Sequence, residues 1–468
     1  MRRAIALGVT GCAVALTIAI VLVSPAGAAC SGTQLSPGAD VKAAVANAPG
    51  GTTFCLAPGV YNTSEVNPKD GDSLVGPGAV LDGGNTAGRA VANYNHASNV
   101  TLNGLEIRNY ANTYGAEDGA VGAFYGTGWL LTDLWVHNNA ASGITLSYGT
   151  SHRVSSSLID HNGCGGIMGA STVSPVITGN EFAVNNTGGN DGVTNSCGGG
   201  KLSRSTGLTF TGNNSHGNHG YGFWLDGMNS TPTFSGNTFS GNEAGGVLLE
   251  INANAQARVT NNYFAGNGMA YPNRVMFGAG VIVAATDHVE IDHNRFTATN
   301  AHAVTLDYSH RSDFPNLGVH DISVHDNDIA LRTDGTSPFS NIGRVGFYGP
   351  QSEPGTGSFN ANRYYFDDPA AWHFALHSVS ADPYNLVTWA QWRAAGQDAT
   401  STLQPAAAFP TDPFPTPTPT TPAPTTPAPS PSATINMLPG DVKVMKCPNP
   451  GVLKTSNKNS HGITVSCV

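Results

Sequence analysis

The chain has 468 residues, a formal charge of −10 at pH 7, only 11% charged residues and 58 glycines. This acidic balance argues against nucleic acid as a partner, because phosphate backbones are bound through clustered lysine and arginine. Beyond the N-terminus, no apolar stretch is long enough to span a bilayer.

The first 29 residues are typical of a secretion signal. Arg2 and Arg3 precede an apolar stretch from Ala4 to Val23, and small residues follow it. Without this segment the formal charge falls from −10 to −12. A lipid anchor on Cys30 is the weaker interpretation, because Gly27 stands where a lipoprotein signal normally has a larger aliphatic residue. We therefore expect a secreted, extracellular protein with no membrane span.

The cysteines predict disulfide bonds. Removing the signal discards Cys12 and leaves six of the seven cysteines, an even number that favours disulfides over metal ligation in an exported chain. Their positions suggest three local pairs: Cys30 with Cys55, Cys164 with Cys197, and Cys447 with Cys467. Many other pairings are possible with this number of cysteines, so the connectivity is a hypothesis.

A short amphipathic helix is predicted between Asp40 and Ala48, ahead of a long series of repeats. From Gly104 to Asn327 one phrase recurs nine times: an apolar stretch, a turn residue and, in all but the last, a second Asn five or six residues later. The first turn positions are Gly104, Asp133, Ser157, Asn180, Asn213, Asn237, Asn262, Asn294 and Asn327. The second positions are Asn109, Asn138, Asn162, Asn185, Asn218, Asn242, Asn267 and Asn300. A basic period of 23 to 25 residues predicts a solenoid, with the helix as a cover for its first coil.

Within each unit the apolar residues alternate, as they do from Thr233 to Phe239, and Gly and Asn bound the runs. This pattern predicts short strands joined by tight turns. Asn tolerates left-handed backbone angles, and identical Asn side chains in successive coils can stack into hydrogen-bonded ladders. A leucine-rich repeat would need regularly spaced leucines that the chain lacks. We therefore predict an all-β fold, a parallel β-helix of about nine or more coils with capped ends.

The strand after the second Asn can be aligned from coil to coil. Its first and third positions are apolar or Gly, so they point inward, and the second and fourth point outward. The outward columns hold Lys201, Trp224 and Leu248, and then Ser203, Asp226, Glu250, Ala284 and Asp307. Adjacent coils stack at roughly 4.8 Å, so we expect the Asp226 and Glu250 carboxylates to lie close together beside an exposed Trp224.

Two like charges at this distance need a compensating cation, a shared proton or a role. Asp226 and Glu250 are therefore the candidate catalytic pair and also the candidate ligands of a calcium ion, which prefers oxygen ligands. The alternative is a pair of solvated surface acids. An outward Trp224 would stack on a sugar ring.

Further candidates lie in the same coils, and we expect one coil face to gather them with the acid pair: His216, His219, Trp224, Asp226, Glu243 and Glu250. His216 points outward between the two Asn of its coil, and His219 precedes Glu243 by one coil. His219 could act as a general acid or base, or could form a structural hydrogen bond with Glu243, and both interpretations stay open. We count His219 among the catalytic candidates, and His216, Glu243 and Trp224 among the substrate-binding candidates.

Lys201 is one of only three lysines between residues 30 and 408, and it lies in a long insertion, residues 186–205. An insertion anchored by a disulfide can wall a groove, so Lys201 is a catalytic candidate, although a lone Lys is more often a surface charge. Many histidines crowd the later coils: His288, His293, His302, His310, His320 and His325. None has a metal motif's spacing together with Cys or Glu, so we predict no zinc site.

The C-terminal part divides into three segments. Residues 385–396, with Trp389 and Trp392, have the length and aromatic content of a closing cap. Residues 409–433 are almost wholly Pro, Thr, Ala and Ser, which predicts an extended disordered linker. The tail, residues 434–468, carries four lysines that suit an anionic wall or glycan, with a solvated disulfide knot as the alternative. We thus expect a signal (1–29), a β-helix domain (30–408), a linker and a tail module.

A family resemblance rests on Gly220–Asp226, on Gly236–Phe239 and on Gly245–Ile251, and on the late segment Trp389–Asp398. Over roughly Cys30–Leu403 the chain resembles secreted bacterial proteins with right-handed parallel β-helix repeats, in the pectate-lyase-like superfamily. The resemblance implies a right-handed helix and a choice among polysaccharide lyases, glycoside hydrolases, uronate epimerases and surface proteins of no known activity. The signatures of pectate lyases and polygalacturonases have no match, which leaves the substrate open.

We therefore expect a secreted polysaccharide-active enzyme, a glycoside hydrolase or a polysaccharide lyase, that uses the pair Asp226 and Glu250. Two acids about 5 Å apart fit a retaining hydrolysis. If calcium bridges them to a uronate, the reaction becomes β-elimination, with Lys201 or His219 as the base. The alternative is a non-catalytic carbohydrate-binding or cell-envelope surface protein. In either case we expect a monomer whose partner is a polysaccharide or a cell-wall glycan.

Overall fold

The computed structural model describes residues 30–113, 119–189, 197–268, 278–298, 302–308, 313–314, 317–332, 343–349, 357–377 and 385–411. It also describes the strands β37 (Leu453–Asn459) and β38 (Gly462–Cys467), which pair antiparallel. The predicted signal, nearly all of the predicted linker and the side chains of the predicted tail lie outside the described residues.

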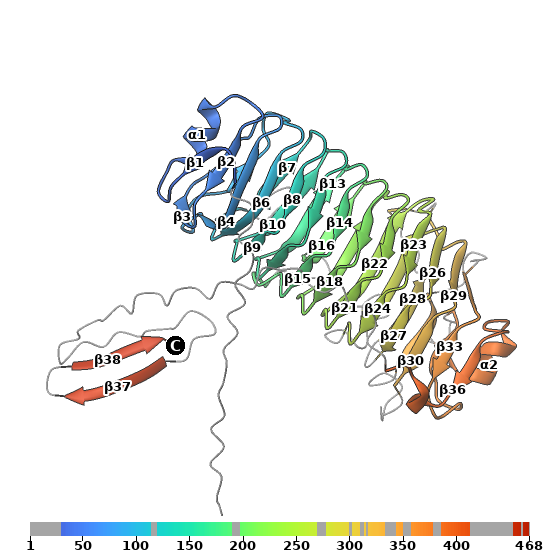
Figure 1. Ribbon diagram of the computed structural model, residues 1–468. Coiled ribbons are helices and arrows are strands. Elements are labelled where there is room, and N and C mark those ends of the chain that lie inside the picture. The colour runs from blue at the N-terminus through green and yellow to red at the C-terminus, as the bar shows by residue number, and fades with distance from the viewer. Residues whose placement is uncertain are drawn as a thin grey trace, which may run out of the picture.

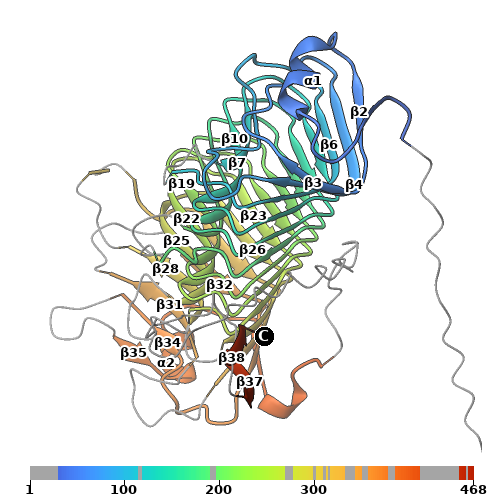
Figure 2. The same cartoon turned by 90° about the vertical axis from the view of Figure 1, so that its left-hand side faces the viewer.

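Parallel strands stacked coil upon coil form the body of residues 30–411 (Figure 1). One sheet, which we call sheet B, has twelve strands, and its long central members lie one above another along one face (Figure 2). Its members in chain order are β5 (Val91–Ala92), β7 (Gly119–Phe124), β10 (Ser142–Ser147), β13 (Gly165–Ala170), β16 (Gly198–Ser203), β19 (Tyr221–Asp226), β22 (Gly245–Asn252), β25 (Ala279–Thr286), β28 (His302–Asp307), β31 (Arg344–Tyr348), β34 (Phe374–Ala375) and β35 (Leu386–Val387).

The other sheet, sheet A, has two branches that meet at the long strands β4 (Ser73–Asp82) and β6 (Thr101–Arg108), next to β1 (Thr33–Leu35), β2 (Thr53–Leu56) and β3 (Gly59–Asn62). Branch A1 contains β8 (Leu130–Thr132), β11 (Arg153–Ser155), β14 (Val176–Thr178), β17 (Thr209–Thr211), β20 (Thr233–Ser235), β23 (Ala257–Thr260), β26 (Val289–Asp292), β29 (Ile322–His325) and β32 (Gly357–Asn360). Branch A2 contains β9 (Trp135–His137), β12 (Leu158–Asp160), β15 (Glu181–Ala183), β18 (Asn214–His216), β21 (Thr238–Ser240), β24 (Tyr263–Ala265), β27 (Arg295–Ala298), β30 (Asp328–Leu331), β33 (Arg363–Tyr365) and β36 (Thr402–Gln404). Each coil supplies one strand to A1, A2 and sheet B in turn, so the predicted parallel β-helix is confirmed.

The core is filled by inward side chains that repeat from coil to coil. The rings of Phe239, Phe264 and Phe296 stack with centroids 5.2 and 4.8 Å apart. Facing them, sheet B needs glycine, because a Cβ added at Gly246 would lie 2.8 Å from the Phe264 ring and 2.4 Å from the carbonyl oxygen of Gly280. The alternation of apolar residues in the sequence therefore indicates which side chains pack inside the β-helix.

The predicted Asn ladders are also present. Asn237 donates through Nδ2 to the Phe210 carbonyl oxygen and to Oδ1 of Asn262, both at 2.8 Å. One ladder runs through Asn180, Asn213, Asn237, Asn262, Asn294, Asn327 and Asn362. A second runs through Asn139, Asn162, Asn185, Asn218, Asn242 and Asn267. Along the ladders a side chain satisfies a backbone carbonyl of an earlier strand and one Asn neighbour in the next coil, which stabilises the stacking of coils.

Both ends of the β-helix are capped as predicted. Helix α1 (Val41–Asn47) begins after Asp40, whose carboxylate accepts from the Ala43 backbone N–H, and it buries two valines against the first coil. At the other end, α2 (Trp389–Ala394) begins with a capping box at Thr388, and a short 3₁₀ turn, η1 (Ala406–Ala408), follows. Trp392 is fully buried and donates to Asp398, a carboxylate that also accepts from the last Asn of the first ladder.

Disulfide bonds join Cys30 to Cys55 and Cys164 to Cys197, the first two predicted pairs. The third pair stays a prediction, because Cys447 and the side chain of Cys467 lie outside the described residues. Two disulfides indicate an extracytoplasmic protein. Among the helices that the structure describes, none combines the length and apolar character needed to cross a membrane.

Candidate functional site

The outward side chains of sheet B form rows that run from coil to coil. We call one of them the carboxylate row, and strand register sets its members: Phe124, Ser147, Ala170, Ser203, Asp226, Glu250, Ala284, Asp307 and Tyr348. In the next row Lys201, Trp224 and Leu248 are direct neighbours. The alignment of the two outward columns in the sequence is therefore confirmed, and Asp226 and Glu250 lie on adjacent strands.

Lys201 connects the two rows. Its ammonium lies 2.6 Å from Oδ2 of Asp226 and 3.8 Å from the centre of the Trp224 ring. The ammonium is thus a compensating cation of the kind that the acid pair was expected to need, and a cation above an indole face is attracted by the ring as well. Since the acid pair already has this partner, repulsion between Asp226 and Glu250 no longer argues for calcium, and a calcium ion at these two residues stays a prediction.

The expected exposure of Trp224 is wrong. The indole points outward from sheet B, but only 7% of the residue is exposed, and Tyr221 packs edge-on against it at 5.4 Å. Leu248 and Ile282 complete a small apolar cluster with these rings on the outside of the sheet. Outward position and exposure differ here because this stretch of sheet B has a second apolar layer. Glu250, expected at the surface, is buried as well.

The structure separates His219 from the acid pair. His219 precedes β19 and Asp226 ends it, so the two residues lie roughly 20 Å apart along an extended strand. Its Nδ1 instead lies 2.8 Å from Oε1 of Glu243, and both side chains are well exposed. Of the two interpretations left open by the sequence, the structural pair with Glu243 fits this geometry, and the position of His219 argues against proton transfer at Asp226.

His216 lies on a different face from Asp226. It ends β18 in branch A2, where its Nε2 is 2.9 Å from Oε1 of Glu181 on the preceding coil. The expectation that one face gathers His216, Trp224 and Asp226 is therefore wrong. The coil turns between β18 and β19, so residues close in sequence point in different directions.

Four buried polar residues, of which the aligned columns included only Asp307, extend the site toward the C-terminal coils. His302 and Arg344 are direct neighbours across β28 and β31, and Asp307 lies next to Tyr348 at the other end of the same strand pair. All four residues are less than one-tenth exposed, and the His302 ring packs against the Tyr348 ring at a tilt of 33°, with ring centres 4.9 Å apart. Burial, and secondly the charge of Arg344, lower the pKa of His302 to about 3, so its imidazole is neutral at neutral pH.

Several buried polar atoms on this face have no hydrogen-bond partner within the described part of the chain: Nε1 of Trp224, Nδ1 of His302 and Oγ1 of Thr305. Buried polar atoms are usually satisfied, and those that are not often mark a functional site. Together with the ionisable groups around them, they make the outer face of sheet B from β16 to β31 the candidate functional site.

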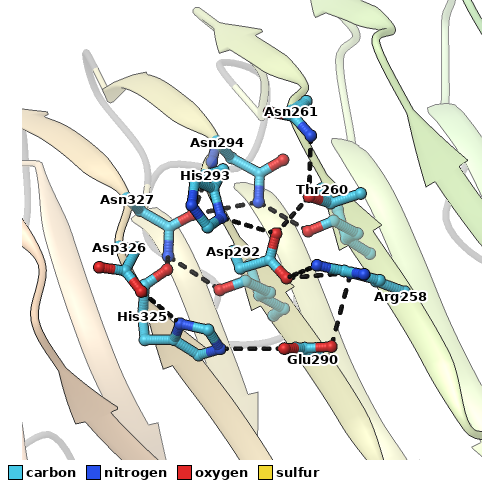
Figure 3. A network of polar contacts seen from close by, with 12 residues as sticks. Arg258, Thr260, Asn261, Glu290, Asp292, His293, Asn294, His325, Asp326 and Asn327 are labelled. Carbon is cyan, nitrogen blue, oxygen red and sulfur yellow. Dashed lines mark hydrogen bonds and ion pairs between the residues drawn. The ribbon is translucent and has the colours of Figure 1, made fainter.

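A second polar cluster lies on branch A1 (Figure 3). Its centre is Asp292, a fully buried carboxylate that accepts from Nε and Nη2 of Arg258 at 3.0 and 2.8 Å. Thr260 and His293 donate to its other oxygen. Burial raises the pKa of Asp292, but these hydrogen bonds outweigh it and leave the pKa below its usual value.

The same cluster contains a group that could hold a metal ion. Glu290, Asp292 and His325 each offer a ligand atom, and these atoms lie within 4.8 Å of one another. The three residues come from adjacent coils, so spacing along the chain could not reveal them. Arg258 already binds Asp292 and lies 3.5 Å from Glu290, so the guanidinium would compete with an ion for both carboxylates. We therefore interpret the cluster as an ion-pair network between coils.

Comparisons with known proteins agree on the fold. Residues 120–296 match the model of the right-handed β-helix region, and no curated protein sequence shows a significant match. Among solved structures, the A-module of the mannuronan C-5 epimerase AlgE6 of Azotobacter vinelandii is similar over 79% of this chain and 95% of its own, with a TM-score of 0.51 and 15% identity. XylC in complex with xylose covers 72% of this chain and 82% of its own, with a TM-score of 0.43 and 11% identity. The alginate lyase AlyGC of family PL6 covers 74% of this chain and 53% of its own, with a TM-score of 0.44 and 13% identity. The protein thus has a right-handed parallel β-helix fold, similar to that of the A-module of a mannuronan C-5 epimerase.

Proposed function

We propose that the protein is a secreted enzyme that cleaves a polysaccharide at the outer face of sheet B, with Asp226 and Glu250 as its carboxylate pair. The observation that carries the proposal is the 2.6 Å ion pair of Lys201 with Asp226, placed in register with Glu250. If the two acids were only solvated surface groups, Glu250 and Lys201 would not both be less than one-tenth exposed.

The spacing of this acid pair supports hydrolysis. Adjacent coils lie roughly 4.8 Å apart, which is close to the separation of about 5 Å between the carboxyl groups of retaining glycosidases. Asp226, paired with Lys201, attacks the anomeric carbon while Glu250 gives a proton to the departing glycosidic oxygen. Glu250 then takes a proton from water, whose oxygen displaces Asp226 from the sugar.

The buried neighbours His302 and Arg344 favour a second reaction, β-elimination from a uronate. Arg344 would bind the uronate carboxylate, and the neutral His302 would remove the proton from the adjacent carbon. The electron pair of the broken C–H bond forms a C=C bond as the C–O bond to the glycosidic oxygen breaks, and this oxygen leaves with a proton taken from water. A calcium ion on Asp226 and Glu250 would instead bind the uronate at that end of sheet B, with Lys201 as the base, because His302 lies at the opposite end of β28 from the carboxylate row.

One assay separates these reactions from simple binding. The purified protein is incubated with mannuronan, polygalacturonate, xylan and a neutral glucan, with and without a chelator. Mannuronan is included because a structurally similar protein is a mannuronan C-5 epimerase. Hydrolysis yields new reducing ends alone, whereas elimination also yields an unsaturated product that absorbs in the ultraviolet. Binding without turnover on any glycan would favour the non-catalytic alternative.

Variants test the residues. Asp226→Asn and Glu250→Gln should each lower turnover at least about a hundredfold, because each acid has a separate chemical role. The matched control is Glu181→Gln, since the Glu181 side chain is 25% exposed against 27% for Asp226 and forms its ion pair on branch A2. Turnover that survives both site substitutions would reject the assignment of the carboxylate pair.

A further inference from the structure

Exposed apolar side chains gather along one edge of the β-helix. Within the described residues seven large hydrophobic side chains are strongly exposed, and five of them lie on the turns and loops that follow sheet B strands. These five are Tyr94, Tyr125, Tyr148, Val173 and Met228. Exposed aromatic side chains in a line are uncommon on a soluble protein and point to a binding surface.

Three rings on this edge form a stack, which we call the aromatic rail: His96, Tyr125 and Tyr148. The ring centres of His96 and Tyr125 are 4.0 Å apart, and those of Tyr125 and Tyr148 are 5.1 Å apart, with the planes within 25° of parallel. Tyr125 is still 40% exposed and Tyr148 42% exposed. The stack therefore covers part of the ring faces, while His96, Tyr125 and Tyr148 all stay exposed to solvent.

The backbone under the rail is in an uncommon conformation. His96, Tyr125 and Tyr148 have φ values of 56°, 54° and 59°, in the left-handed region that bulky residues usually avoid. Two coils further on, the same turn position is occupied by Arg204, and then by Gly227, which adopts this conformation without strain. The turn thus requires left-handed angles, and the first coils meet the requirement with aromatic residues at a cost in stability. Because left-handed angles recur at turns throughout the β-helix, the presence of tyrosine at these positions, where Asn or Gly would fit without strain, needs another explanation.

The rail lies in line with the candidate active site. Tyr125 follows Phe124 and Tyr148 follows Ser147, which are the first two members of the carboxylate row. Three coil steps lead from Ser147 along that row to Asp226, or roughly 14 Å at the strand spacing. A linear ligand parallel to the β-helix axis can therefore contact the rail and the acid pair at once.

We propose that the aromatic rail is a subsite for an extended polysaccharide chain that lies along the β-helix axis and passes over Asp226 and Glu250. A pyranose ring has an apolar C–H surface and a rim of hydroxyl groups, so it packs on aromatic side chains that have polar neighbours. Here exposed threonines and serines such as Thr127 and Ser151 flank the rings. Rings that repeat at the coil spacing suit a ligand that itself repeats. This inference rests on the proposed function for the identity of the polymer.

The test removes the rings and keeps the backbone. The double variant Tyr125→Asn, Tyr148→Asn is suitable because Asn tolerates left-handed angles better than Ala does. The control is Trp372→Asn, which removes an aromatic side chain of similar exposure near the C-terminal end. Wild type and variants are compared on the most readily cleaved of the four glycans and on its trisaccharide, and by retention in gels that contain each polymer. Circular dichroism and thermal melting confirm folding.

We expect the rail variant to raise KM for the polymer about tenfold, for two lost ring contacts, with kcat/KM on the trisaccharide unchanged within about twofold. Gel retention should fall for the rail variant alone. Unchanged polymer affinity of the rail variant would overturn the rail and leave the proposed function intact. An equal loss of kcat/KM on the polymer and on the trisaccharide would have the same meaning. If the wild type binds a polymer without cleaving it, the proposed function fails. The rail is then tested by gel retention alone: reduced retention of the rail variant supports it, and unchanged retention rejects it. If the wild type neither binds nor cleaves any of the four glycans, both are rejected.

Discussion

The ion pair of Lys201 and Asp226 can be tested by a double-mutant cycle of stability. Lys201→Met keeps the aliphatic stem and removes the charge, and Asp226→Asn keeps the shape of the acid. The ammonium contacts Asp226 at 2.6 Å and the Trp224 ring at 3.8 Å. The single Lys201 variant should lose both contacts, about 2–4 kcal/mol of unfolding free energy.

The cycle isolates the charge pair from the contact with the indole. A hydrogen bond between charged groups contributes about 1.5–3 kcal/mol, and partial exposure of Asp226 screens the pair, so we expect a coupling energy of about 1–2 kcal/mol. Urea unfolding, followed by tryptophan fluorescence, measures the unfolding free energy of all four proteins. The coupling energy should fall in 1 M salt, where charges are screened beyond roughly 3 Å. A coupling below about 0.5 kcal/mol would refute the view that Lys201 is the cation that stabilises the acid pair.

Asn237→Ala removes two donated and two accepted hydrogen bonds in the core, so the unfolding free energy should fall by about 3–5 kcal/mol. The control Asn214→Ala changes an outward residue of the preceding coil and should lower it by less than about 0.5 kcal/mol. Equal losses of the two variants in urea unfolding would contradict the role of the ladder. Burial lowers the pKa of His152 to about 4. The folded state therefore favours the neutral imidazole, and stability that is complete above about pH 6.5 should decline as the pH falls toward 4. His152→Gln should flatten this part of the pH profile of Tm, and an unaltered profile would count against it. Arg258→Gln should increase the zinc affinity of Glu290, Asp292 and His325 in calorimetric titration, because the competing guanidinium is gone; affinity equal to that of the wild type would exclude the competition. Deleting residues 434–468 should leave cleavage of soluble glycan unchanged and weaken retention on insoluble cell-wall glycan in pull-down assays, and equal retention would remove the tail's proposed role.

The fold could be predicted because the coils of a β-helix repeat the same turn and packing requirements at a regular spacing along the sequence. Every coil needs a turn residue that adopts left-handed angles, such as Gly212 or Gly236, and next to it a polar side chain that satisfies a backbone carbonyl, such as Asn213 or Asn237. The alternation between turns then tells inward from outward side chains. These are local requirements, repeated in each coil, so a single sequence shows them.

The site could be predicted only in part, because its environment depends on neighbouring coils. The adjacency of Asp226 and Glu250 followed from register alone, but the burial of Trp224 arises from Tyr221, Leu248 and Ile282, on its own strand and on two later coils. The alignment also missed Arg344, since β31 lies beyond the last repeated Asn phrase.

The inward and outward faces of sheet B have different roles. The inward side chains and the Asn ladders stabilise the coils, and they repeat because every coil has the same packing problem. The outward rows are free of that requirement, so their departures from a simple repeat, from Tyr125 and Tyr148 through Lys201 and Asp226 to Arg344, need another explanation. If the explanation is a polysaccharide chain along the axis, substitutions in these rows should change binding or turnover more than they change Tm, whereas substitutions in the ladders should do the reverse.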